Sequence, residues 1–381
     1  MVAPVAIQQY IGLETSRWSA IAAGGLCVAL PVIVLPVIVQ RDRVRAIGRY
    51  RQVTDASDAN WAMPVHPWVA EGQHTVRFAT VGAFIREWPQ RLDFVRRVEE
   101  LGFDAYWAND HPTRSMDCWA TLAALAVATR TIRLISLVSC IFYRSPALLA
   151  RLAADVDHLS NGRLVMGLGL GDDTQEFAQL QLPFPSVRER QEALEETLHI
   201  VRGLWYDAPF SYRGRHFQVA DAGISPRPLQ QPHVPILVGG GGERITLRQV
   251  ARYADMSNFG AHEWTGGAYD VADVQRKCAA LRQHCTALGR PYESVLRSHY
   301  TPLLVLAKTP AALHSKKSST RIPDPQLHTV PLFATPTEAI AHYQALVDAG
   351  MQYFLAQVSA DDDETVRLFA NEVIPAIRPA S

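Results

Sequence analysis

The sequence predicts an α/β fold, a (β/α)₈ TIM barrel with insertions that covers residues 74–381 and follows an N-terminal extension. Two observations support this prediction. Apolar, β-branched runs alternate with amphipathic helical patterns, and the strand and helix unit recurs eight times in this segment. A doubly wound open sheet is the alternative, because right-handed βαβ crossovers build both folds and periodicity does not separate them.

The expected elements follow in order along the chain. The first strand, residues 76–82, leads to a helix at 89–101 that Gly102 ends. Ser145 and Pro146 have the residue types of a helix N-cap and first helical position. The later strands are expected at 105–109, 133–138, 164–168, 235–238, 255–259, 297–306 and 352–358. The later helices are expected at 121–129, 146–159, 187–205, 243–253 and 364–377.

Composition places the chain among globular proteins. Of its 381 residues, 48% are hydrophobic and 19% are charged, which excludes a mostly disordered chain. Lys and Arg number 37, as do Asp and Glu, so no global field would attract nucleic acid, and we expect no nucleic-acid partner. The five cysteines form no CxxC pair, and HxH and HExxH are absent, so no metal site is expected.

The extension differs from the rest of the chain. After an N-terminal segment, residues 1–18, the run 19–39 carries no charged side chain, and we expect a transmembrane helix at 19–40. Arginines cluster directly after it, so the barrel would lie in the cytoplasm, anchored to the membrane. Residues 41–73 are expected to form a linker. A surface hairpin, or an extended start without a membrane role, is the alternative for the apolar run.

Functional groups of a barrel collect where its strands end. Asp110 and His111 follow the second expected strand, and an imidazole beside a carboxylate is suited to proton transfer; a hydrogen-bonded loop histidine is the alternative. Asp172 and Asp173 follow the fourth strand, where they would either act at the site or cap a helix. Gly239–Gly242 follow the fifth strand and would open a phosphate site at a helix N-terminus, or form a tight strand exit.

The order of these motifs resembles the luciferase-like monooxygenase family, which includes flavin-dependent and F420-dependent oxidoreductases. The residues that carry the resemblance are WANDH at 107–111, FYRSPALLARLAADVDHLSNGRLVMGLGLGDD at 142–173, RERQEALEETLHIVRGLW at 188–205, PRPLQQPHVPILVGGGGER at 226–244 and ARYADMSNFG at 251–260. They span nearly all of residues 74–379 in family order.

The resemblance implies a barrel that holds coenzyme F420 or FMN at its mouth without a metal. It implies that His111 lies by the reactive carbon of the cofactor, with Asp110 in support, and that Asp172 stands where relatives carry a glutamate. It further implies a non-proline cis peptide near Ser139 and Cys140, a phosphate loop at Gly239, Gly240, Gly241 and Gly242, and a flanking Asn258.

The implied function is hydride transfer between the bound cofactor and a small organic substrate, with His111 and Asp172 as catalytic candidates. An FMNH2-dependent monooxygenase that uses O2 is one alternative. A membrane-tethered, non-catalytic flavin-binding protein is another, and a hydrolase barrel would require a divalent metal. A homodimer is the candidate assembly.

Overall fold

The computed structural model describes residues 64–206, 209–320, 322 and 329–380. The expected N-terminal segment, the expected transmembrane helix at 19–40 and most of the expected linker lie outside the described residues. Across the ranges that are described, no helix combines the length and the apolar character needed to cross a membrane.

Eight parallel strands form a closed barrel. Each pairs with the next in chain order, and β1 pairs with β12 from Arg77 opposite Tyr353 to Ala83 opposite Ser359, which closes the ring. The closure confirms the (β/α)₈ barrel and excludes the open sheet. The barrel strands are β1 (Arg77–Ala83), β2 (Ala105–Ala108), β3 (Arg133–Ser136), β5 (Leu164–Gly169), β8 (Ile236–Gly239), β9 (Met256–Gly260), β10 (Leu296–Leu306) and β12 (Tyr353–Ser359).

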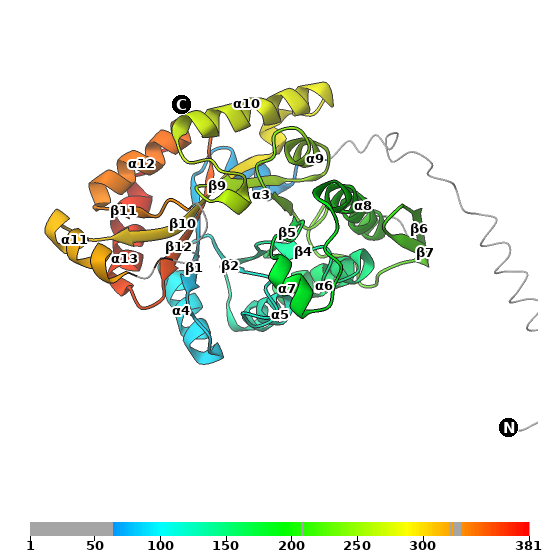
Figure 1. Ribbon diagram of the computed structural model, residues 1–381, viewed down its shortest axis with the longest axis horizontal. Helices are drawn as coiled ribbons and strands as arrows, with labels where there is room; N and C mark the ends of the chain where they lie inside the picture. The colour runs from blue at the N-terminus through cyan, green and yellow to red at the C-terminus, as the bar shows by residue number, and fades with distance from the viewer. Residues whose placement is uncertain (1–63, 207–208, 321, 323–328, 381) are drawn as a thin grey trace, which may run out of the picture. The chain divides into compact units, whose positions relative to one another are not determined.

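Helices lie outside the strands (Figure 1). Ser145 caps the third of them as expected, because its side chain accepts from the backbone N–H of Leu148. The main helices are α4 (Trp88–Glu100), α5 (Cys118–Ala128), α6 (Pro146–Leu159), α8 (Val187–Tyr206), α9 (Thr246–Tyr253), α10 (Val271–Ala287), α12 (Pro336–Asp348) and α13 (Asp363–Leu368).

The core lies between strands and helices. Near the seam where the barrel closes, the rings of Phe78 on β1 and Phe354 on β12 stack with centroids 5.1 Å apart. Tyr343 of α12 and Phe369 meet the Phe78 ring edge-on at 5.5 and 5.3 Å. Such aromatic pairs add to the burial of apolar area, so this cluster holds the last helices on the seam.

Smaller elements interrupt the repeat. They include an antiparallel hairpin beyond α8 (Figure 1) and short pieces near the strand ends. These elements are β4 (Ser139–Cys140), α7 (Thr174–Gln179), β6 (Phe210–Arg213), β7 (Gln218–Ala222), η1 (Glu263–Thr265), η2 (Tyr292–Ser294), α11 (Pro310–Ser319) and β11 (Leu332–Ala334).

Three expectations about helices are wrong in detail. A helix, α3 (Pro67–Gly72), lies inside the expected linker, and its Trp68 is buried edge-on against Tyr353 of the barrel. Helix α9 begins at Thr246 and not at residue 243, because the chain still turns through the residues after Gly240, whose φ is 113°. The expected helix at 364–377 is divided into α13, a π-helical segment (η3, Phe369–Val373) and a 3₁₀ turn (η4, Ile374–Ala376).

Candidate active site

A cavity of about 380 Å³ opens at the carboxyl ends of the strands. Its volume is in the range of small-molecule and cofactor sites. Its wall comes from seven of the eight barrel strands or the loops that follow them, and the strand ends are where a barrel carries its functional groups. The polar side chains in the wall include Asn109, Asp110, His111, Tyr143, Asp172, Arg190, Thr246, Asn258, His262, Tyr300 and Gln357.

The structure brings together all but one of the residues expected at the site. His111, Asp172, Asp110, Cys140, Gly239–Gly242 and Asn258 all line the cavity. Ser139 does not line it. Its side chain is buried, donates to Asp110 at 2.9 Å and accepts from Trp119 Nε1 at 3.0 Å, so both of its hydrogen bonds lie within the protein. The structure thus shows Ser139 in contact with Asp110 and Trp119, and its expected contact with the cofactor stays a prediction.

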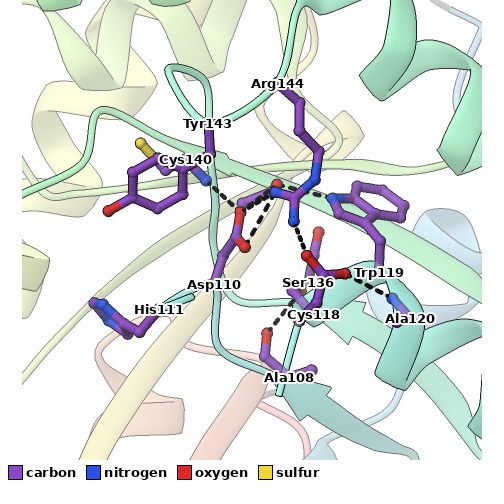
Figure 2. Close-up of polar contacts among 12 residues, drawn as sticks. Ala108, Asp110, His111, Cys118, Trp119, Ala120, Ser136, Cys140, Tyr143 and Arg144 are labelled. Carbon is purple, nitrogen blue, oxygen red and sulfur yellow. Dashed lines mark hydrogen bonds and ion pairs between the residues drawn. The ribbon is translucent and has the colours of Figure 1, made fainter. Parts of the chain in front are cut away.

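Asp110 joins the exit of β2 to the loop after β3. One of its carboxylate oxygens accepts from Cys140 N at 3.1 Å, and Arg144 donates to both oxygens at 2.8 and 3.1 Å. Arg144 also pairs with Asp117, the N-cap of α5. Figure 2 shows the Asp110 side chain directed toward Arg144 and Cys140, with His111 pointing away from them. Because protein donors surround this carboxylate, Asp110 fixes the strand end from which His111 projects.

His111 is held by a buried carboxylate. Its Nδ1 lies 2.9 Å from Oε2 of Glu176, whose side chain is 0% exposed, whereas the His111 side chain is 27% exposed. Thr113 donates to the other oxygen of Glu176 through its backbone N–H and its hydroxyl, and Tyr143 donates to Oε2. The Glu176 carboxylate thus has four donors and fixes the ring of His111.

The charges at this pair follow from burial and hydrogen bonding. Burial alone would raise the pKa of Glu176, but the hydrogen bonds from His111, Thr113 and Tyr143 lower it to about 2. Glu176 is therefore an acceptor only, so His111 carries a proton on Nδ1 and its Nε2 is the atom that changes protonation. Burial lowers the pKa of His111, but the hydrogen bond and charge of Glu176 outweigh burial and raise it overall.

The two aspartates after β5 have separate roles. Asp173 accepts from the backbone N–H groups of Gln175 and Glu176 as the N-cap of α7, and it pairs with Arg114. Asp172 lines the cavity instead and is exposed. Ligand atoms of His111, Asp173 and Glu176 lie within 4.8 Å of one another, but the carboxylates already bind protein donors, which favours a hydrogen-bond network over a metal centre there.

Arg190 and the glycines at the end of β8 form a candidate anion site in the wall of the cavity. Arg190 of α8 is buried, donates to the carbonyl of Gly171 and has a buried Nε without a hydrogen-bond partner. Within the described part of the chain it forms no ion pair with an acidic side chain. Gly239–Gly242 and Thr246, at the start of α9, line the same cavity. A phosphate group here would meet a guanidinium, a glycine-rich backbone and a helix N-terminus, so the residues present fit the phosphate of F420 or FMN.

The glycines near the cavity floor make room for one side chain. The non-proline cis peptide joins Leu137 to Val138, two residues before the position expected near Ser139 and Cys140. A Cβ on Gly169 would lie 2.3 Å from Cγ2 of Val138, and one on Gly239 would lie 3.0 Å from its Cγ1. The approach of Val138, which itself lines the cavity, therefore requires a glycine at position 169, whereas a Cβ on Gly239 would fit only if Val138 shifted by a few tenths of an ångström.

A family model described as luciferase-like monooxygenase matches residues 59–366. The chain belongs to the luciferase-like monooxygenase family. The match covers most of the chain and confirms the resemblance found in the sequence. It begins ahead of residue 74, in agreement with the position of α3.

Named relatives of this luciferase-like chain depend on F420. The F420-dependent glucose-6-phosphate dehydrogenase of Amycolatopsis mediterranei is 27% identical over 320 residues, which cover 75% of this chain and 94% of the relative. The F420-dependent hydroxymycolic acid dehydrogenase of Mycobacterium tuberculosis is 28% identical over 309 residues, covering 74% and 82%.

Solved structures share the fold of this luciferase-like chain. An F420-dependent secondary alcohol dehydrogenase in complex with an F420-acetone adduct superposes with a TM-score of 0.67 at 19% identity, over 80% of this chain and 99% of the other. A monooxygenase from Streptomyces bottropensis superposes with a TM-score of 0.66 at 22% identity, over 78% and 99%. The luciferase-like chain is an oxidoreductase that uses F420 or FMN for hydride transfer, as the sequence predicted.

Sequence reasoning missed three charged residues of the site. Glu176 and Arg144 lie in helical or loop segments where Glu and Arg are common, and neither has a motif of its own. Arg190 lies inside the quoted stretch at 188–205, but helical periodicity places an arginine equally well on a solvated face. Only the structure shows that Arg190 is buried beside the glycines that follow β8.

Proposed function

We propose that the protein is an F420-dependent oxidoreductase in which His111 moves the proton that accompanies hydride transfer to or from a small organic substrate. The observation that carries the proposal is the His111–Glu176 pair at the wall of the cavity. A bound F420 would supply the carbon that accepts or donates the hydride. The protein supplies position, exclusion of water and the path of the proton.

In the direction of oxidation, a substrate hydroxyl beside His111 would lose its proton to Nε2 as its carbon loses hydride. Glu176 stabilises the imidazolium that forms, because it carries a negative charge 2.9 Å from Nδ1. In the direction of reduction the same proton returns to the carbonyl oxygen. Asp172, at the same mouth, is a candidate for a second proton-transfer group, and its carboxyl reaches one methylene less far than a glutamate would.

Arg190, Gly239–Gly242 and Thr246 would hold the cofactor phosphate, with Cys140 and Asn258 further along the wall. The preference for F420 over FMN rests on the Asp110–His111 motif and on the F420-dependent relatives. The cytoplasmic location, the candidate anchor at 19–40 and the homodimer stay predictions.

The test is a cofactor titration of the purified full chain with F420 and with FMN, followed by turnover with glucose 6-phosphate and with a secondary alcohol. We expect F420 to bind and His111→Ala to retain F420 while losing turnover. Tight binding of FMN without F420 binding would favour the FMN-dependent monooxygenase. Unchanged turnover in His111→Ala would remove the proposed role of His111.

A further inference from the structure

A second cavity adjoins the first on the side of β1 and β2. It measures about 540 Å³, and its wall includes Phe84 and Arg86 after β1 and Arg91 in the first turns of α4. Asn109, His111, Trp264 and Gln357 line both cavities. A substrate in the second cavity would therefore lie on one side of His111 and a cofactor in the first cavity on the other.

The charged side chains that line the second cavity are positive. Its lining includes three arginines, Arg86, Arg91 and Arg114, and no Asp or Glu. Arg114 is neutralised by Asp173, whereas Arg86 is exposed and has no ion-pair partner within the described ranges. The wall thus carries a net positive charge, which attracts anions.

Arg91 is the unusual member of this set. It is 7% exposed, and its guanidinium donates to the Tyr106 hydroxyl at 2.8 Å and to the Ile85 carbonyl at 3.0 Å. Burial raises the pKa of Tyr106, so both acceptors are neutral. The Nε of Arg91 has no hydrogen-bond partner, and no acidic side chain of the described residues pairs with it. A buried guanidinium without a counterion is costly, and a bound anion would offset that cost.

Thr121 supplies an independent observation at the same wall. It lies in α5, is 1% exposed and lines the second cavity, and its hydroxyl also has no hydrogen-bond partner. Buried polar atoms are nearly always paired, so two such atoms at one cavity indicate a missing ligand with acceptor oxygens.

We propose that the second cavity binds the substrate and selects an organic anion, a carboxylate or phosphate ester, through Arg91 and Thr121. The identification of this anion as the substrate rests on the proposed function. The anionic group would sit against α4 and α5, while the carbon to be oxidised or reduced would lie at His111. The oligoglutamate tail of F420 offers the same carboxylate chemistry, and the test separates the two sources.

The test measures binding to the full chain by calorimetry, with hexanoate, hexanamide of matched size, and inorganic phosphate as probes. We expect hexanoate to bind about tenfold or more tightly than hexanamide, because the neutral amide leaves the guanidinium unpaired. Arg91→Met should abolish this preference, Arg91→Lys should keep part of it, and Thr121→Val should weaken hexanoate binding. Arg96→Met removes an exposed arginine from the same helix and should change nothing.

Equal affinity for hexanoate and hexanamide, absence of binding by hexanoate and phosphate, or an Arg91→Met variant that keeps the preference would overturn the proposal. Because Arg91→Met also removes two hydrogen bonds, Arg86→Gln at the exposed rim gives a second variant, in which hexanoate binding should weaken with folding intact. F420 affinity should be the same in Arg91→Met and wild type. A tenfold loss would assign the anion to the cofactor tail. All of these experiments measure binding and none requires turnover. They would therefore test the anion site even if the proposed hydride transfer proved wrong.

Discussion

The Nδ1 atom of His111 lies 2.9 Å from Oε2 of Glu176, a carboxylate that also accepts from Thr113 and Tyr143. The two residues are 65 positions apart in the sequence, and they meet because β2 and β5 end at the same mouth of the barrel. This contact fixes which ring nitrogen exchanges a proton, and it makes the pKa of His111 depend on Glu176.

Glu176→Gln should shift the pH profile of substrate oxidation. Oxidation requires neutral His111, so kcat/KM falls as pH falls through the pKa of His111, which Glu176 raises. Removing the charge lowers that pKa, and the acidic limb should move to lower pH while the plateau falls. The check is kcat/KM against pH for the variant and for Glu189→Gln on the surface of α8. A limb that stays in place would show that Glu176 does not control the proton of His111.

Arg190→Met should weaken cofactor binding without unfolding the barrel. A hydrogen bond to a charged group contributes about 1.5–3 kcal/mol, so the dissociation constant should rise by about tenfold to hundredfold. Titration with FMN and with riboflavin separates charge from packing, because only FMN carries the phosphate. The ratio of the affinity for FMN to the affinity for riboflavin should shrink in Arg190→Met. The same ratio should stay unchanged in Arg188→Met, an exposed position on the same helix. A ratio unaffected by Arg190→Met would place the phosphate elsewhere.

Asp110→Asn should destabilise the protein. The carboxylate is buried and accepts from Ser139, Cys140 and Arg144, and an amide cannot accept on both sides. Because Arg144 keeps Asp117 as a partner, we expect a loss of about 1–3 kcal/mol in the free energy of unfolding. Asp117→Asn changes the second carboxylate that pairs with Arg144. This carboxylate is 46% exposed, and the change should cost less than about 1 kcal/mol. Urea unfolding of both variants is the measurement. Equal losses of stability would show that the buried Asp110 carboxylate contributes no more than the exposed Asp117.

The sequence predicted the eight barrel strands to within two residues at either end. Strands such as β5 and β8 are buried on both faces and therefore appear as short, continuous apolar runs. The candidates His111, Asp172 and Gly239–Gly242 do line the cavity, because each lies at the end of a strand or in the loop that follows it. Element boundaries were less predictable where a turn decides them, as at α9, where residues 243–245 continue the turn that follows Gly240.

The partners of these residues could not be predicted in the same way. Glu176 lies on α7, a helix of six residues without an apolar repeat, and pairs with a residue of another barrel unit. Arg91 falls in an amphipathic helix, where an arginine is ordinarily solvated. Its burial depends on Tyr106 and on the Ile85 carbonyl, which only the closed barrel brings to it. Periodicity identifies the faces of an element, whereas pairing across units requires the fold.

Stability should fall as pH drops below about 6.5, in part through His299. This histidine lies on β10, is 3% exposed and is hydrogen-bonded through Nε2 to the Ala268 carbonyl, and burial lowers its pKa to about 4. Between those two values the unfolded chain binds the proton and the folded chain does not, so acid favours unfolding. His299 alone should contribute a loss of about 2 kcal/mol between about pH 6.5 and about pH 5. The measurement is urea unfolding at both pH values. The decrease in the free energy of unfolding should be smaller in His299→Gln than in the wild type, and it should equal that of the wild type in the exposed control His74→Gln. If His299→Gln loses as much stability as the wild type, another group accounts for the acid sensitivity.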